Sequence, residues 1–238
     1  MPHPSGRPWI LAHRGARLVA PENTTEAFRE AARLGADAVE FDVRRSADGS
    51  LVVHHDAILG ASDSPIIELG FTEIRHLAPH IPTLSEALEA CEGMWVDIEV
   101  KNYEVEPDWD PRDVTVESVA RLVDALGVRE RVLVSSFNRP TVDRAAQLGF
   151  RTGWLLGRTV DPTIEASRWP TDHAIALPPL SSMGPGEADR IVSAFAAIDV
   201  EVGVWTVNEG PEISRLAAAG VGLICTDDVE TAVAVCQG

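Results

Sequence analysis

The chain has 238 residues, carries a formal net charge of -17 at pH 7, and is 45% hydrophobic but only 5% aromatic. No linker-like stretch interrupts it, so we expect a single domain over residues 1–238 with an aliphatic core. The negative charge argues against general binding to nucleic acid or anionic membranes. The three cysteines lack metal-ligand spacing and no apolar run could span a bilayer, so we expect a soluble, cytoplasmic protein without stable membrane insertion.

Short apolar runs follow one another along the chain, with amphipathic segments between them. Most of the runs are almost continuously apolar, as in strands that are buried on both faces of a parallel sheet. We expect eight strands, at Trp9–Ala12, Ala38–Val43, Trp95–Val100, Val132–Ser135, Thr152–Leu156, Ala174–Leu177, Val200–Val207 and Gly222–Cys225. Helical periodicity is found at Thr24–Leu34, Leu84–Cys91, Val116–Leu126, Thr141–Leu148, Glu187–Ile198 and Glu212–Ala219.

Eight strands alternating with helices over this length predict a (β/α)8 TIM barrel, whose usual size is about 250 residues. We favour this barrel over an open doubly wound sheet because the chain has no glycine-rich phosphate loop of the P-loop or dinucleotide-binding type. The fifth unit has the weakest pattern, since Asp161–Arg168 must supply a short helix before Pro170.

One additional apolar run, Leu51–His55, is separated from the second strand only by a turn that contains Asp48-Gly49. An Asp-Gly pair is a strong hairpin signal, so we expect a β-hairpin extension after strand 2. If these are the two loop residues, Asp42 lies opposite His55, and the hairpin carries His55 to the mouth of the barrel. A slip of one residue would present His54 instead.

The second expected strand carries two carboxylates, Glu40 and Asp42, which leave it by the same face because they are two residues apart. Two acids on one buried face repel each other unless a cation lies between them, so we interpret them as metal ligands. The alternative is that this face is exposed to solvent. Glu99, at the end of the third strand, completes an all-oxygen set that suits magnesium, calcium or manganese better than zinc.

Other functional side chains also lie at the C-terminal ends of the expected strands, where the active site of a TIM barrel is found. His13 follows the first strand and the hairpin brings His55 to the same end, so one histidine can act as base and the other as acid near neutral pH. Arg14 is a cation that can hold a phosphate in an otherwise acidic protein, and Lys101 shares one strand face with Glu99 because the two are two residues apart. The alternative for Lys101 is an ion pair with Glu99 inside the barrel.

A series of short motifs runs through nearly the whole chain. In the N-terminal third they are Ala12-His13-Arg14-Gly15, Pro21-Glu22-Asn23-Thr24, Ala27-Phe28, Gly35-Ala36-Asp37, Glu40-Phe41-Asp42-Val43, Asp48-Gly49, Val52-Val53 and His55-Asp56. Further on they are Ile81-Pro82-Thr83-Leu84 with Glu86, Ile98-Glu99-Val100-Lys101, Val204-Trp205-Thr206-Val207-Asn208 and Thr226-Asp227. In order and spacing this set resembles the signature of the glycerophosphodiester phosphodiesterases.

The resemblance implies a phospholipase C-like phosphodiesterase barrel that hydrolyses glycerophosphodiesters, its small-molecule substrates, to glycerol 3-phosphate and an alcohol. It also implies one divalent metal ion as cofactor, either Mg²⁺ or Ca²⁺, with Mn²⁺ as a third candidate. The ligands of that ion fall on Glu40, Asp42 and Glu99.

The remaining functional positions of the family also have counterparts here. Its catalytic histidines fall on His13 and His55, which decides between the two adjacent histidines of the hairpin. Its phosphate contacts fall on Arg14 and Lys101, and its substrate-lining tryptophan falls on Trp205. The resemblance does not assign the acid and the base, and it leaves open whether a cyclic phosphate intermediate forms.

The segment after the histidine-aspartate pair departs from the family pattern. Many members have an arginine and two threonines there, whereas this chain has the run Ala57–Asp63, and 57–81 is short for the small inserted domain of the family. The alcohol headgroup therefore stays open. A lysophospholipase D-type enzyme is an alternative on the same barrel. A non-catalytic barrel that binds a phosphorylated ligand is a second alternative, which the two histidines argue against.

Overall fold

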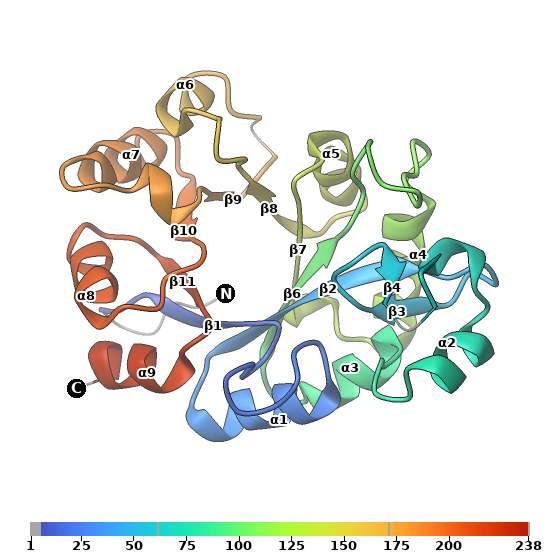
Figure 1. Cartoon of the computed structure of the whole chain (residues 1–238). Helices are drawn as coiled ribbons and strands as arrows, with labels where there is room; N and C mark the ends of the chain where they lie inside the picture. Colours follow the sequence, from blue (N-terminus) through green and yellow to red (C-terminus); the bar gives the residue numbers. More distant parts are fainter. Residues whose placement is uncertain (1–5, 61, 171, 238) are drawn as a thin grey trace.

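The computed structural model describes residues 6–60, 62–170 and 172–237, which form a closed barrel of parallel strands inside a ring of helices (Figure 1). The predicted (β/α)8 TIM barrel is confirmed, and each of the eight predicted strands is present. The barrel strands are β1 (Trp9–His13), β2 (Ala38–Arg45), β6 (Trp95–Val100), β7 (Val132–Ser136), β8 (Arg151–Leu155), β9 (Ile175–Leu177), β10 (Glu201–Val204) and β11 (Leu223–Thr226).

Pairing between β1 and β2 closes the barrel, whose strand order is β1-β11-β10-β9-β8-β7-β6-β2. The register sets His13 beside Glu40 on the neighbouring strand, and Asp42 beside Glu99. Residues at one register level of neighbouring strands point to the same side of a sheet. Strand pairing therefore gathers these four side chains at the C-terminal end of the barrel.

Aliphatic side chains fill the barrel beneath this end. Leu177 lies between two glycines, because a Cβ at Gly153 would come within 2.6 Å of its side chain and a Cβ at Gly203 within 2.7 Å. The two glycines thus make room for a large residue on the strand between them. The cluster around it closes the base of the barrel and consists of Trp9, Leu11, Ala38, Leu133, Leu155, Ile175, Leu177, Leu223 and Cys225.

The helices begin where the sequence supplies caps. Thr24 accepts a hydrogen bond from the backbone N–H of Ala27, and Thr83 forms a reciprocal capping box with Glu86. The α-helices are α1 (Thr25–Leu34), α2 (Phe71–Leu77), α3 (Leu84–Ala90), α4 (Val114–Leu126), α5 (Arg139–Gln147), α6 (Pro162–Ala166), α7 (Glu187–Ala196), α8 (Gly210–Ala218) and α9 (Val229–Gln237). The 3-10 helices are η1 (Ile66–Glu68), η2 (Arg129–Arg131) and η3 (Leu180–Ser182). The six predicted helices are present, α6 is short as expected, and α2 and α9 were not predicted.

The predicted hairpin extension is also present, since β3 (Leu51–Val53) pairs antiparallel with β2. Its predicted register was wrong by one residue. Arg45 lies opposite Leu51, and the backbone N–H of His54 donates to the carbonyl of Asp42 at 3.0 Å. His54, rather than His55, is therefore the residue opposite Asp42.

The loop of this hairpin has three residues instead of two. The backbone N–H of Ser46 donates to the carbonyl of Ser50, and Gly49 adopts a left-handed φ of 85°. The Asp48 side chain accepts hydrogen bonds from the Ser46 hydroxyl at 2.6 Å and from the Ser50 N–H at 3.2 Å. A turn followed by a left-handed glycine is the usual three-residue hairpin, and the additional residue shifts the register.

The segment between β3 and α3 forms a small lobe that lies at the right of Figure 1, beside the barrel. It contains β4 (Ile58–Leu59) and β5 (Ser64–Pro65), which pair with each other, followed by η1 and α2. Within the described residues, no helix combines the length and the hydropathy needed to cross a membrane. The lobe has its own apolar cluster, made of Val52, Leu59, Ile66, Leu69, Ile74, Ala78 and Ile81.

Candidate active site

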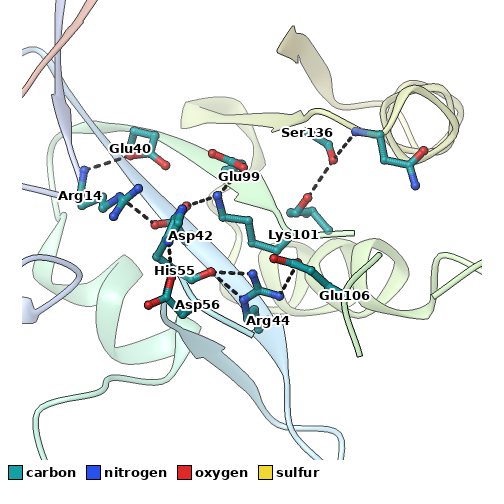
Figure 2. A network of polar contacts seen from close by, with 12 residues as sticks. Arg14, Glu40, Asp42, Arg44, His55, Asp56, Glu99, Lys101, Glu106 and Ser136 are labelled. Atoms are coloured by element: carbon teal, nitrogen blue, oxygen red, sulfur yellow. Dashed lines mark hydrogen bonds and ion pairs between the residues drawn. The ribbon is translucent and has the colours of Figure 1, made fainter. Parts of the chain in front are cut away.

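Three buried carboxylates meet at the C-terminal end of the barrel. Glu40, Asp42 and Glu99 each contribute one oxygen, and these oxygens lie within 4.8 Å of one another (Figure 2). Oε1 of Glu40 is buried and has no hydrogen-bond partner among the described residues. Converging carboxylate oxygens, one of them without a donor, suit a hard divalent cation such as Mg²⁺, Ca²⁺ or Mn²⁺.

The three carboxyl groups differ in their affinity for protons. Burial raises the pKa of Glu40 well above its usual value, and the charges of Asp42 and Glu99 raise it further. Burial also raises the pKa of Glu99, against the charge of Lys101. For Asp42 burial acts in the same direction, but Lys101 and Arg14 together hold its pKa below the usual range. Asp42 is thus the carboxyl of the cluster that most favours the charged form, and a cation bound here would compete with a proton for Glu40.

Asp42 is held by three residues from two loops, those after β1 and β6. Asn23, on the loop after β1, donates from Nδ2 to Oδ2 of Asp42 at 2.7 Å. Nε of Arg14 lies 3.3 Å from the same oxygen, and Nζ of Lys101 lies 2.8 Å from Oδ1. Asn23 adopts a left-handed φ of 56°, which asparagine tolerates better than most residues. This loop conformation turns the amide toward the carboxylate.

The turn after β1 aims two groups of Arg14 at the site. Arg14 has a left-handed φ of 57°, a conformation that costs a non-glycine residue about 1–3 kcal/mol. Its backbone N–H donates to Oε2 of Glu40 at 2.9 Å, and its guanidinium donates to Glu22 at 2.8 Å. The next residue, Gly15, also has positive φ, and a Cβ there would come within 2.7 Å of the Cβ of Ala27. Only glycine fits this turn.

Lys101 lies inside the pocket and is also part of an ion-pair network. Its Nζ lies 2.6 Å from Oε1 of Glu99 and 2.8 Å from Oδ1 of Asp42. Burial alone would lower the pKa of Lys101, but these two carboxylates raise it above its usual value. The ion pair with Glu99 that the sequence left as an alternative is therefore present. An ammonium group has three donors, so one is left for a phosphate oxygen.

His13 is held by a carboxylate from the opposite end of the chain. Its Nδ1 lies 2.7 Å from Oδ1 of Asp227, and the other oxygen of that carboxylate, Oδ2, accepts a hydrogen bond from Nδ2 of Asn208 at 2.9 Å. Burial would raise the pKa of Asp227, but the hydrogen bonds with His13 and Asn208 hold it at about 2. A carboxylate on Nδ1 favours the tautomer that carries a proton there, which leaves Nε2 for proton transfer.

His55 lies just beyond the end of β3. Because the strand stops at Val53, side chains no longer alternate, and His55 lines the pocket although His54 is the residue opposite Asp42. Nδ1 of His55 lies 2.7 Å from Oδ1 of Asp56. His54 is half-buried, and this burial lowers its pKa.

A pocket of about 330 Å³ occupies this end of the barrel. Trp205 forms one wall, where its Nε1 donates to the carbonyl of Leu177 at 2.8 Å and its ring meets that of Phe137 edge-on at 5.3 Å. Asp42 is only 1% exposed and does not line the pocket itself. The other predicted site residues all line the pocket, namely His13, Arg14, Glu40, His55, Glu99, Lys101 and Trp205.

Sequence reasoning missed a second group of residues at this site. Asn23 and Asp227 belong to motifs that resemble the family signature, but spacing along the chain assigned them no role. Tyr103, Phe137 and Arg158 come from loops after three different strands and line the pocket beside Trp205. The guanidinium of Arg158 lies 6.0 Å from the centre of the Trp205 ring. Loop residues carry no periodic signal, so only the folded chain shows them together.

Comparison with known proteins agrees with this arrangement. The sequence model of the Glycerophosphoryl diester phosphodiesterase family matches residues 13–231. The chain is 30% identical to a glycerophosphodiester phosphodiesterase of Caldanaerobacter subterraneus subsp. tengcongensis, with 93% of this chain and 95% of that protein covered. It is 28% identical to probable glycerophosphodiester phosphodiesterase 2 of Mycobacterium tuberculosis, over 91% of this chain and 86% of that protein.

Solved structures show the same barrel. The glycerophosphodiester phosphodiesterase of Thermotoga maritima superposes with a TM-score of 0.82 at 28% identity and covers 96% of this chain and 98% of its own. A phosphodiesterase of Oleispira antarctica, solved with its product sn-glycerol-3-phosphate, has a TM-score of 0.78 at 23% identity and covers 98% of each chain. Since the family model spans most of the sequence and the barrel is the same, the chain belongs to the glycerophosphoryl diester phosphodiesterase family.

Proposed function

We propose that this protein is a metal-dependent phosphodiesterase that hydrolyses glycerophosphodiesters to glycerol 3-phosphate and an alcohol. One observation carries the proposal: three buried carboxylates converge within 4.8 Å in the pocket that His13 and His55 line. We assign Glu40, Asp42 and Glu99 as ligands of one divalent cation.

The cations of the pocket would bind the substrate phosphate. A phosphodiester carries one negative charge that repels nucleophiles, and this charge grows in the transition state. Arg14 and the free donor of Lys101 lie beside the carboxylate cluster and would hold the phosphate oxygens. A bound divalent cation would act as a Lewis acid on the same group. Trp205 and Phe137 would pack against the carbon atoms of the substrate.

The two histidines would move the protons. One takes a proton from the attacking water or from a substrate hydroxyl, and the other gives a proton to the departing alkoxide. Each such transfer typically contributes about 10² to 10⁴ in rate. Asp227 would hold His13 in the tautomer required and stabilise its protonated form.

Release of glycerol 3-phosphate tests the proposal directly. The protein is treated with a chelator, and hydrolysis of glycerophosphocholine, glycerophosphoethanolamine and glycerophosphoglycerol is measured after addition of Mg²⁺, Ca²⁺ or Mn²⁺. We expect activity only with an added cation, and comparison of the substrates identifies the headgroup. Full activity in the metal-free sample would overturn the role of the metal.

Single substitutions test the histidines. His13→Ala and His55→Ala should each lower kcat by at least about 100-fold while circular dichroism stays unchanged. His76→Ala is the matched control, because His76 is exposed on α2 and does not line the pocket. Normal turnover by either pocket variant would exclude that histidine as acid or base.

A lysophospholipase D-type activity is the second candidate, and the exposed apolar residues at the mouth of the barrel favour it. Leu18 is 68% exposed on the loop after β1, and Val105 and Trp109 are 94% and 43% exposed on the loop after β6. These loops follow strands at the end where the pocket lies. Turnover of micellar lysophosphatidylcholine faster than glycerophosphocholine, lost in Leu18→Asp and Val105→Asp, would rank this activity first.

A further inference from the structure

Arg44 is buried at the end of β2 with only 1% of its surface exposed, and it does not line the pocket. Its Nε and Nη2 donate to the main-chain carbonyl of His55 at 2.8 and 2.6 Å. Its Nη1 donates to Oε2 of Glu106 at 3.0 Å and to Oδ2 of Asp108 at 2.6 Å. Figure 2 shows the guanidinium between the His55 carbonyl and Glu106. One side chain thus connects the hairpin to the loop after β6.

The contact with the carbonyl matters because little else orders His55. Its side chain is 38% exposed, and Asp56, the carboxylate on its ring, is 73% exposed. An exposed pair of this kind contributes little to order. β3 has already ended at Val53, so residue 55 lies beyond the regular pairing of the hairpin. Beyond the hydrogen bond from the His54 N–H to the Asp42 carbonyl, this stretch of backbone is restrained by two charge-assisted hydrogen bonds from a buried arginine.

The other side of Arg44 is equally well defined. Glu106 and Asp108 neutralise a guanidinium that would otherwise be buried without a counter-ion, and Asp108 is itself buried. Both acids belong to the loop after β6, which also carries Tyr103 of the pocket. The arginine therefore sets the position of His55 relative to the side of the pocket that Tyr103 lines.

We infer that Arg44 is a positioning residue for the reaction: it fixes the backbone of His55, and thereby the imidazole, while Glu106 and Asp108 fix the guanidinium. The inference rests on the proposed role of His55. A displacement of about 1 Å in a reacting group can lower a rate about 100-fold, so loss of this anchor is expected to act on kcat.

The first test is Arg44→Ala. We expect kcat to fall about 100-fold, with KM and the affinity for Mn²⁺ each changing less than threefold. Arg44→Lys keeps the charge but lacks the rigid fork from which Nε and Nη2 both donate to one carbonyl oxygen, so its kcat should lie between those of Arg44→Ala and the unchanged protein. Asp108→Asn leaves the arginine in place with a weaker partner and should lower kcat in the same sense, which keeps the inference testable if Arg44→Ala does not fold.

Arg131 provides the matched control for loss of a structural arginine. It donates to the carbonyls of Cys91, Met94 and Leu88 at the opposite end of β7 from the pocket. We expect both Arg131→Ala and Arg44→Ala to lower the thermal midpoint. Because Arg131 lies far from the reacting groups, Arg131→Ala should leave kcat within about twofold of the unchanged protein. An equal loss of kcat in both variants would overturn the inference in favour of general destabilisation.

A double-mutant cycle with His55 separates this inference from the proposed function. If Arg44 acts through His55, adding Arg44→Ala to His55→Ala should lower the residual kcat less than twofold. A further 100-fold loss would mean that Arg44 acts by another route, and the inference fails. Full activity of His55→Ala alone would instead show that the proposed role of His55 is wrong. An inactive His55→Ala together with a fully active Arg44→Ala would overturn the inference alone.

Discussion

Glu40 and Asp42 illustrate how neighbouring residues of one strand acquire opposite properties. Both side chains are buried in the same cluster, but Arg14, Asn23 and Lys101 contact Asp42, and the pKa values of the two carboxyls shift in opposite directions. Burial of a charge without a counter-ion is unfavourable, so an ionised Glu40 would serve the proposed cation rather than the fold.

Glu40→Gln tests this distinction. We expect at least about 100-fold lower activity, because a neutral amide is a poorer ligand for a hard cation. In the metal-free protein the thermal midpoint should stay constant or rise, since the substitution removes a carboxyl whose pKa burial has raised. Scanning calorimetry in the presence of a chelator measures this midpoint. A clear fall of the midpoint in metal-free Glu40→Gln would show that the Glu40 carboxyl stabilises the fold.

Asp227→Asn tests the partner of His13. The amide keeps the shape of the carboxylate but no longer stabilises a protonated imidazole, so kcat should fall about 10² to 10⁴-fold with little change in KM. The neighbouring Asp228→Asn is the control, because Asp228 accepts a hydrogen bond from the backbone N–H of Thr231 at the start of α9. Steady-state kinetics on both variants tests this prediction. Comparable kcat values for Asp227→Asn and Asp228→Asn would exclude a role of Asp227 as the partner of His13.

At the scale of elements, the segment before β9 packs on α5 through a buried histidine. Nε2 of His173 lies 2.8 Å from Oδ1 of Asp143, and the rings of Trp154 and Trp169 flank the imidazole. Burial lowers the pKa of His173 below 6.5, even though Asp143 favours the charged form. Burial in this packing therefore favours the neutral imidazole.

This contact predicts a pH dependence of stability. Because the folded pKa of His173 is the lower one, the unfolded chain binds more protons as pH falls through about 6.5, and the free energy of unfolding decreases below that pH. In His173→Gln the free energy of unfolding should decrease less below that pH, because the titrating imidazole is gone. Urea unfolding between pH 5 and 7.5 measures the free energy of unfolding of both proteins. If the difference in this free energy between the two proteins does not change with pH, His173 is not the source of the pH dependence.

At the scale of the molecule, the proposed cation site would couple cation binding to global stability. A cation that binds only the folded chain, at 100 times its Kd, stabilises it by about 2.7 kcal/mol, which corresponds to a rise of about 5–10 °C in the thermal midpoint of a chain of this size. We expect this rise with Mg²⁺, Ca²⁺ or Mn²⁺, and its absence in Glu40→Gln. An equal rise in both proteins would place the cation elsewhere.

Much of the architecture follows from the sequence. Strands buried on both faces are continuous apolar runs, so all eight were predicted, and helices with one polar face were predicted from their period. α9 was missed because Val229–Gln237 is apolar almost all round. The hairpin register was wrong because the Asp48 side chain, through contacts with Ser46 and Ser50, stabilises a three-residue loop.

At the site too, some features follow from the sequence and others only from the folded structure. A spacing of two residues puts Glu40 beside Asp42 in any strand, so the sequence by itself determined the carboxylate pair, the fold class and the family. The partners that tune these groups lie far away in the chain: Asp227 is 214 residues from His13, and Asp108 is 64 residues from Arg44. Only the closed barrel brings such residues into contact, because strand pairing joins the two ends of the chain and loops carry no period. Which carboxyl stays charged, and what holds each histidine, was therefore decided by the tertiary structure.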